Sequence, residues 1–193
     1  MYREKYKSYI DLIGSRLSEK RFIHSVNVAK AGVALAERYG GDKEKAYLAG
    51  ILHDIMKEEK PEIQLQMLKR HDIMTDTVTL GARPLWHAKT GAIFCKEQLG
   101  IDDQDLLNAI AYHTTGRANM SQLEKLVFLA DYIGEERDYQ DVDVMRAETM
   151  ISMERGMRYA LAFSIRDLVN RDKTIHLDTV AAYNFVTSQL NER

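Results

Sequence analysis

Apolar residues recur at steps of three and four along most of this chain, and this spacing most strongly restricts the fold. Residues spaced in this way share one face of an α-helix. Strand-like alternation of apolar and polar residues is not convincing anywhere, and the sequence holds only two prolines. We therefore predict an all-α fold of about eight to ten helices. The clearest apolar stripes are Tyr6, Tyr9, Ile10, Ile13 and Leu17, and then Phe22, Val26, Ala29, Val33 and Ala36.

Local signals indicate where several of these helices begin and end. Serine and aspartate favour the N-cap, proline is tolerated in the first turn, and glycine favours the end of a helix. A Ser-x-x-Glu sequence can form a capping box. These rules predict a stop at Gly40-Gly41, N-caps at Asp42 and Asp102, first turns at Pro61 and Pro84, an end near Gly100, a capping box at Ser121 and Glu124, and helices over roughly 148–170 and 178–190.

Charge and apolar content restrict the class of protein. The 193 residues include 27 Lys and Arg against 29 Asp and Glu, so no general attraction to nucleic acid or to an anionic membrane is expected. The longest apolar stretches, such as 46–52, are too short to span a bilayer. The only cysteine, Cys95, is predicted to be a small core residue, as suits the reducing cytoplasm. We expect one cytoplasmic domain over residues 1–193, and a homodimer is left open.

The dipeptide His53-Asp54 is the strongest candidate for a functional group. It follows the apolar, small-residue run 46–52 near the end of a predicted helix. Burying an imidazole beside a carboxylate is costly unless the two groups are paired or bind a cation. A second copy of the dipeptide, His71-Asp72, follows the polar end of a short helix, where a solvated loop is expected.

Four further residues are candidates to complete a metal site. His24 and His87 lie inside predicted helices, His113 lies at the end of one, and Asp131 stands among apolar neighbours. Each histidine taken alone is more often a hydrogen-bonded structural group or a surface residue. Imidazole and carboxylate together suit iron, manganese, cobalt or zinc. Because six groups exceed the needs of one tetrahedral site, two metals sharing a carboxylate are plausible if the groups converge.

The order His24, His53-Asp54 and Asp131 resembles the HD superfamily of metal-dependent phosphohydrolases, and His87 and His113 resemble its two-metal subgroup. Over roughly residues 20–185 the chain is similar to the YqeK family within it. The strings that carry this similarity are Arg21-Phe-Ile-His24, Leu52-His-Asp-Ile-Met-Lys57, Trp86-His-Ala-Lys-Thr-Gly-Ala92, Tyr112-His-Thr-Thr-Gly-Arg117, Ala130-Asp-Tyr-Ile133 with Arg137, and Thr174-Ile-His176.

The resemblance implies an HD-domain helical bundle with its metal ligands within about 20–135 and C-terminal helices covering the site. It implies a binuclear transition-metal centre, with iron first and manganese, cobalt or zinc as alternatives. One metal would be held by His24, His53, Asp54 and Asp131. The second would be held by Asp54, His87 and His113, so that Asp54 bridges the two. The implied reaction is symmetrical hydrolysis of diadenosine tetraphosphate to two ADP by a hydroxide between the metals.

A tetraphosphate also needs cationic and hydrogen-bonding contacts. Lys57 stands about one helical turn after Asp54, so both are candidate catalytic residues. The other candidates for phosphate or nucleotide contacts are Arg21, Lys89, Thr114, Thr115, Arg117, Arg137 and His176. For the charged residues and His176 the alternative is a solvated surface position, and for the two threonines it is a helix end. One departure from the family is Gly134-Glu135, where Glu-Pro is frequent.

Three other functions remain compatible with these residues. The same site could hydrolyse a different nucleotide, such as a nucleoside polyphosphate, a monophosphate or a cyclic nucleotide. An HD scaffold without turnover could act as a nucleotide-binding regulator, although an intact ligand set argues against it. A helical scaffold that binds no metal is the last alternative.

Overall fold

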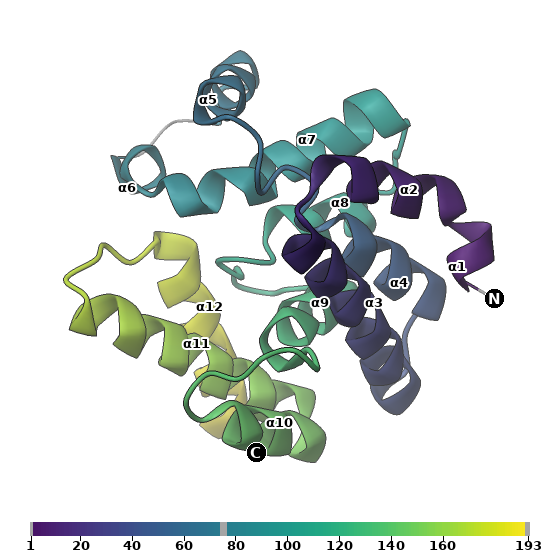
Figure 1. The fold of residues 1–193 in the computed structure, drawn as a ribbon. Coiled ribbons are helices and arrows are strands. Elements are labelled where there is room, and N and C mark those ends of the chain that lie inside the picture. Colours follow the sequence, from purple (N-terminus) through teal and green to yellow (C-terminus); the bar gives the residue numbers. More distant parts are fainter. Residues whose placement is uncertain (1, 74–76, 192–193) are drawn as a thin grey trace.

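The computed structural model describes residues 2–73 and 77–191, and all regular structure within them is helical (Figure 1). Ten α-helices have eight residues or more, as the apolar spacing predicts, and α1 and α6 are shorter. The elements are α1 (Tyr2–Lys5), α2 (Lys7–Arg16), α3 (Glu19–Tyr39), α4 (Lys43–Leu52), α5 (Pro61–Arg70), α6 (Thr77–Gly81), the 3-10 helix η1 (Arg83–Leu85), α7 (Trp86–Leu99), α8 (Gln104–Ala111), α9 (Gln122–Ile133), α10 (Val142–Ile151), α11 (Met153–Asn170) and α12 (Leu177–Asn191).

Most of the predicted helix ends are confirmed. Helix α3 ends directly before Gly40, and the Asp42 carboxylate accepts hydrogen bonds from the first backbone amides of α4. Pro61 begins α5. At the start of α9 the Ser121 hydroxyl and the Glu124 carboxylate form the reciprocal capping box. Local chemistry therefore sets the lengths of the helices that carry the site.

Two predicted boundaries are wrong. The expected helix over 148–170 is divided at Ser152, which is extended and caps α11 by accepting a hydrogen bond from the amide of Arg155. Both parts bury apolar residues against the same core, so the periodicity continues across the break. The N-cap of α8 is Asp103 rather than Asp102, because the Asp103 carboxylate accepts from the amides of Asp105 and Leu106.

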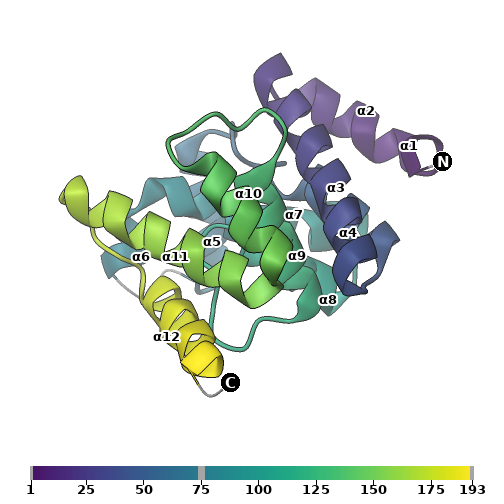
Figure 2. The ribbon, with the colours of Figure 1, turned by 90° about the horizontal axis from the view of Figure 1, so that it is seen from below.

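Helices α3, α4, α7, α8 and α9 form the centre of the molecule. Helix α9 packs on α3, α4 and α8, and α7 packs on α8. Side chains such as Ile51, Ile110 and Phe128 are fully buried between them. Helices α10 and α11 pack on α9, and α12 packs on α11. In Figure 2, α3 and α4 lie on one side of α9 and α12 lies on the other.

A close backbone contact joins α3 to α4. A Cβ atom on Gly50 would lie 2.6 Å from the Cα of Ala29, so the crossing requires a glycine there. This contact brings the first half of α3, which carries His24, next to His53 at the end of α4. Within the described residues, no helix has both the length and the apolar character needed to cross a membrane.

Candidate metal centre

The six side chains predicted as metal ligands converge in the structure. They come from α3, the turn after α4, the first turn of α7, the turn after α8 and the last turn of α9. The side chains of Asp54 and all four histidines are almost completely buried, and that of Asp131 is 18% exposed. The convergent residues are His24, His53, Asp54, His87, His113 and Asp131.

The two carboxylate oxygens of Asp54 face different pairs of histidines. Oδ2 lies 3.6 Å from Nε2 of His53 and 3.8 Å from Nε2 of His24. Oδ1 lies 3.0 Å from Nε2 of His87 and 3.6 Å from Nε2 of His113. A carboxylate placed in this way between two donor groups can connect two cations.

The group on the Oδ2 side of Asp54 contains a second carboxylate. Oδ1 of Asp131 lies 3.0 Å from Nε2 of His24, and the Nε2 atoms of His24 and His53 are 3.3 Å apart. On the Oδ1 side, the Nε2 atoms of His87 and His113 are 3.1 Å apart. Two neutral nitrogens at such distances repel each other unless a proton or a cation lies between them.

Hydrogen bonds outside the cluster orient three of the imidazoles. Nδ1 of His53 lies 2.7 Å from the carbonyl oxygen of Gly50, and Nδ1 of His113 lies 2.7 Å from that of Ile110. Nδ1 of His24 contacts the Glu136 carboxylate. Because these partners are acceptors, each Nδ1 donates its proton, and each Nε2 lone pair faces the cluster. Such outer hydrogen bonds are characteristic of histidines that bind metals.

Burial determines the charge state of the cluster. It lowers the pKa of His53 to about 3 and that of His87 to about 4, so both imidazoles are neutral at neutral pH. Burial alone would raise the pKa of Asp54, but His53, His113, His87 and Lys57 hold that pKa well below its ordinary value. His53 and His87 therefore offer neutral imidazoles and Asp54 an ionised carboxylate, the forms that bind cations, whereas contacts with Asp131 and Glu136 raise the pKa of His24 against the effect of its burial.

These residues fit a metal centre. Donor atoms of His24, His53 and Asp131 lie within 4.8 Å of one another, as do donor atoms of His53, Asp54 and His113. Nitrogen and oxygen donors in this mixture suit first-row transition metals.

Three of the predicted phosphate-binding cations lie against the cluster. Nη1 of Arg21 is 3.0 Å from Oδ2 of Asp54. Nζ of Lys57 is 3.9 Å from Oδ1 of Asp54 and 3.2 Å from Nε2 of His87. Arg137 donates to the backbone and the side chain of Asp131. These side chains are about one quarter to one third exposed, so they can also meet an anion that enters from solvent.

Three other predicted phosphate contacts have side chains that interact with residues outside the cluster. Arg117 donates two hydrogen bonds, of 2.6 and 2.9 Å, to the buried Glu124 carboxylate. Nζ of Lys89 lies over the ring of Tyr112, 3.4 Å from its centre. The Thr115 hydroxyl donates to the carbonyl of Gly116. The structure therefore does not bring these three candidates to the cluster.

Thr114 and His176 line a cavity beside the cluster rather than the cluster itself. Nε2 of His176 lies 3.1 Å from the Thr79 hydroxyl, and its Nδ1 accepts a hydrogen bond from the backbone amide of Asp178. His176 thus fixes the start of α12. His71, of the second His-Asp dipeptide, is exposed and pairs with Glu97 on α7, as expected for a solvated segment.

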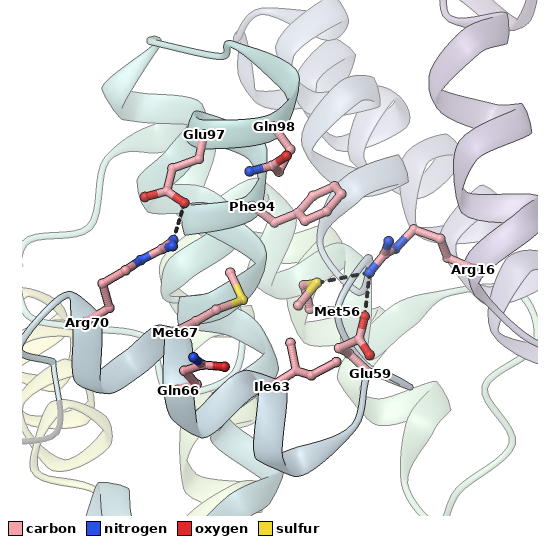
Figure 3. Close-up of a pocket in the computed structure, with 10 residues that line it drawn as sticks. All are labelled: Arg16, Met56, Glu59, Ile63, Gln66, Met67, Arg70, Phe94, Glu97 and Gln98. Carbon is pink, nitrogen blue, oxygen red and sulfur yellow. Dashed lines mark hydrogen bonds and ion pairs between the residues drawn. The ribbon is translucent and has the colours of Figure 1, made fainter.

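Two supporting residues were not predicted. Glu136 contacts Nδ1 of His24 and lies directly after the Gly134-Glu135 departure, which could have drawn attention to it. Arg16 contacts the segment that follows His53-Asp54. Its Nη2 atom lies 2.8 Å from the Glu59 carboxylate and 3.3 Å from the Met56 sulfur (Figure 3). Arg16 lies outside every motif, so no sequence signal indicated it.

Comparison with known proteins identifies relatives of this chain. The family model described as "HD domain" matches residues 21–135. The chain is 36% identical over 175 residues to the symmetrical bis(5'-nucleosyl)-tetraphosphatase of Halalkalibacterium halodurans, an alignment that covers 91% of this chain and 93% of the relative. It is 33% identical over 176 residues to the enzyme of the same name in Bacillus subtilis, with 91% and 94% covered.

A solved structure shares the fold over nearly the whole length. The crystal structure of a Clostridium acetobutylicum protein, described as a "predicted HD superfamily hydrolase involved in NAD metabolism", matches with a TM-score of 0.92 and 34% identity. The match covers 95% of this chain and 97% of that one. The likeness therefore includes the C-terminal helices as well as the region that the family model matches.

Proposed function

This chain belongs to the HD-domain family, and from that premise we propose that it cleaves diadenosine tetraphosphate symmetrically into two ADP. The observation that carries the proposal is the position of Asp54 between two pairs of histidines. Relatives that span nine tenths of the chain bear the name of this activity. The reaction class follows from the family, and the choice of substrate follows from those relatives.

The residues that would hold metal form two groups. His24, His53 and Asp131 would hold one ion with Oδ2 of Asp54, and His87 and His113 would hold the other with Oδ1. Such a centre supplies an activated water nucleophile and stabilises negative charge on a phosphoryl oxygen. We propose iron as the metal, with manganese, cobalt and zinc as alternatives that the same donors accept. Elemental analysis of the purified protein tests the identity and the number of ions.

The remaining residues orient these groups and bind the substrate. Glu136 and the carbonyl groups of Gly50 and Ile110 fix the imidazole rings, so that the Nε2 atoms stay directed inward. Lys57 and Arg21 border Asp54 from two sides and would hold the phosphate chain by charge. Holding the reacting phosphorus in line is a large part of catalysis in phosphoryl transfer.

The C-terminal part completes the proposed enzyme. Helices α10 and α11 pack on α9, which carries Asp131, and α12 packs on α11. We propose that residues 1–193 act as one unit in which these helices cover the site. The substrate is a free small molecule, so the proposal needs no nucleic acid, membrane or protein partner. A free nucleotide as substrate also points to a cytoplasmic enzyme.

A product assay tests the function. Protein loaded with iron, manganese or cobalt is incubated with diadenosine tetraphosphate, and the products are separated by chromatography. ADP alone is the expected product. AMP with ATP, or no turnover with any of the three metals, would overturn the proposal. Guanosine triphosphate, AMP and cyclic AMP serve as competing substrates, and tight binding without turnover would instead indicate a regulator.

A further inference from the structure

One arginine of α10, Arg146, binds the backbone where α9 ends. Its Nε atom donates to the carbonyl oxygen of Ile133 at 3.3 Å, and its Nη2 atom donates to those of Gly134 and Arg137 at 2.9 and 3.0 Å. The last carbonyl groups of a helix have no partner within the helix, and a cation placed there also interacts favourably with the helix dipole. Arg146 therefore joins the end of α9 to the loop that follows it.

The segment held in this way, residues 134–137, carries two side chains that support the candidate metal centre. The Glu136 carboxylate accepts a hydrogen bond from Nδ1 of His24. Arg137 donates to the backbone carbonyl of Asp131 at 2.7 Å and also to its carboxylate. Both supported residues belong to the same proposed metal position. A shift of this one segment would therefore disturb two ligands of that position together.

The position of the Glu136 carboxylate depends on the backbone of this segment. A Cβ atom on Gly134 would lie 2.9 Å from Oε2 and 3.0 Å from Oε1 of Glu136. The φ angle of Gly134 is −42°, outside the left-handed region, so glycine provides space here rather than an unusual conformation. On the other side, Asn27 of α3 donates to Oε2 at 2.9 Å. The carboxylate is thus confined between α3 and the loop backbone.

Arg146 supports the backbone and does not reach the candidate ligands. Its remaining nitrogen, Nη1, lies 3.0 Å from the carboxylate of Asp143, whose side chain is 92% exposed. A planar guanidinium presents its donors in fixed directions, so it can hold several carbonyl groups at a defined spacing. Such an arrangement suits a residue that orients the main chain, whereas a substrate contact would need free donors directed at the cluster.

We propose that Arg146 is a positioning residue of the candidate metal centre. It fixes the segment 134–137 and thereby the contacts of that segment with His24 and Asp131. This inference rests on the proposed function for the presence of a metal at these two residues. Arg146 and the two supporting side chains all follow residue 135, where the match to the HD family model ends. The metal centre therefore depends on a part of the chain beyond that match.

A cycle of single and double variants tests this role through metal affinity. Calorimetry measures the binding of manganese ions to the metal-free wild type, to Arg146→Met, to Glu136→Gln and to the double variant. Arg155→Met is the matched control, because Arg155 also makes two hydrogen bonds, of 2.7 and 2.8 Å, but to the Glu148 side chain of α10. Thermal melting of the metal-free proteins shows how far each variant destabilises the fold.

The expected result is a loss of metal affinity that depends on Glu136. Arg146→Met should lower manganese affinity about tenfold, the lower end of the usual effect of losing an outer contact of a metal ligand. In the Glu136→Gln background the same change should cost less by roughly twofold or more, because the contact that Arg146 supports is already weakened. Arg155→Met should keep the wild-type affinity, even if its melting temperature falls.

Two results would overturn the proposal. Wild-type affinity in folded Arg146→Met, or an equal loss in both backgrounds, would mean that Arg146 only stabilises the fold. If Arg146→Met does not fold, the cycle is repeated with Arg146→Lys, which keeps the charge and the aliphatic stem. It should also lower affinity, because one nitrogen cannot reproduce the spacing of Nε and Nη2.

Failure of the proposed function gives a different pattern. A wild type that binds manganese but leaves diadenosine tetraphosphate intact would overturn the proposed function, while the affinities would still decide the role of Arg146. A wild type that binds no manganese, iron or cobalt would overturn both.

Discussion

The carboxylate of Glu136 accepts a hydrogen bond from Nδ1 of His24, although the two residues are 112 positions apart in the chain. A carboxylate behind a histidine fixes the ring and strengthens Nε2 as a donor to metal. We predict that Glu136→Gln lowers metal affinity about 10- to 100-fold, the usual effect of losing such a partner. Calorimetric titration of the metal-free protein measures this. The exposed neighbour Glu135 provides the control Glu135→Gln, and equal affinities in the two variants would contradict the prediction.

Asp54 should be less replaceable than any residue around it. Its two oxygens face both histidine pairs, so Asp54→Asn removes one negative charge from both proposed metal positions at once. We predict a loss of activity larger than the roughly 10- to 100-fold typical of a supporting residue, together with a lower metal content. The second His-Asp dipeptide supplies a matched control, because Asp72→Asn alters an exposed residue. Full activity in Asp54→Asn would exclude this site as the catalytic centre.

The candidate metal ligands could be found from the sequence, because polar groups in an apolar, buried context need a partner or a cation. The apolar run before His53-Asp54 distinguished it from the exposed His71-Asp72. The supporting residues could not be predicted from the sequence in this way. Glu136 reaches His24 through the crossing of α3 and the loop after α9, and no local pattern encodes that contact.

The phosphate contacts show a different limit of sequence reasoning. Arg117 and Lys89 are predicted as phosphate contacts from their proximity along the chain to candidate ligands. In the structure the two side chains contact Glu124 and the ring of Tyr112, because the direction of a side chain depends on the rotation of its helix or turn. Glu124 was visible as a capping residue, and its carboxylate also binds Arg117. In the fold, periodicity likewise predicted the helices but did not reveal the one-residue break at Ser152, because both flanking helices bury apolar faces.

The crossing of α3 and α4 should not tolerate a methyl group at Gly50. The added Cβ would lie 2.6 Å from the Cα and 2.7 Å from the backbone nitrogen of Ala29, and neither helix can yield without moving His24 or His53. We predict that Gly50→Ala lowers the free energy of unfolding by about 3 kcal/mol, the upper part of the range for overpacking. Gly81→Ala is the control, since a Cβ there meets nothing within 4 Å. Chemical denaturation of both variants measures the difference, and equal stabilities would refute the contact.

Cys95 should be unreactive in the folded protein. The side chain is fully buried, and burial raises the pKa of its thiol from 9.0 to about 12. At pH 8 the thiol is therefore protonated and inaccessible, so a thiol reagent should label it only after unfolding. Since the unfolded thiol ionises first, this group should lower stability as the pH rises from about 9 toward 12. Rapid labelling of the native protein at pH 8 would contradict this expectation.

Removing the Arg117 side chain should weaken the stability of the fold more than it weakens substrate binding. The Glu124 carboxylate is buried and accepts two hydrogen bonds from the guanidinium, so Arg117→Met leaves a buried negative charge without its partner. We predict a loss of about 3 kcal/mol in the free energy of unfolding, at the low end for a broken buried pair because Arg117 is partly exposed. The double variant Arg117→Met with Glu124→Gln should recover part of that loss, because it removes the unpaired charge. Steady-state kinetics separates this role from a phosphate contact. A KM for diadenosine tetraphosphate that rises in Arg117→Met without any loss of stability would instead support Arg117 as a phosphate contact.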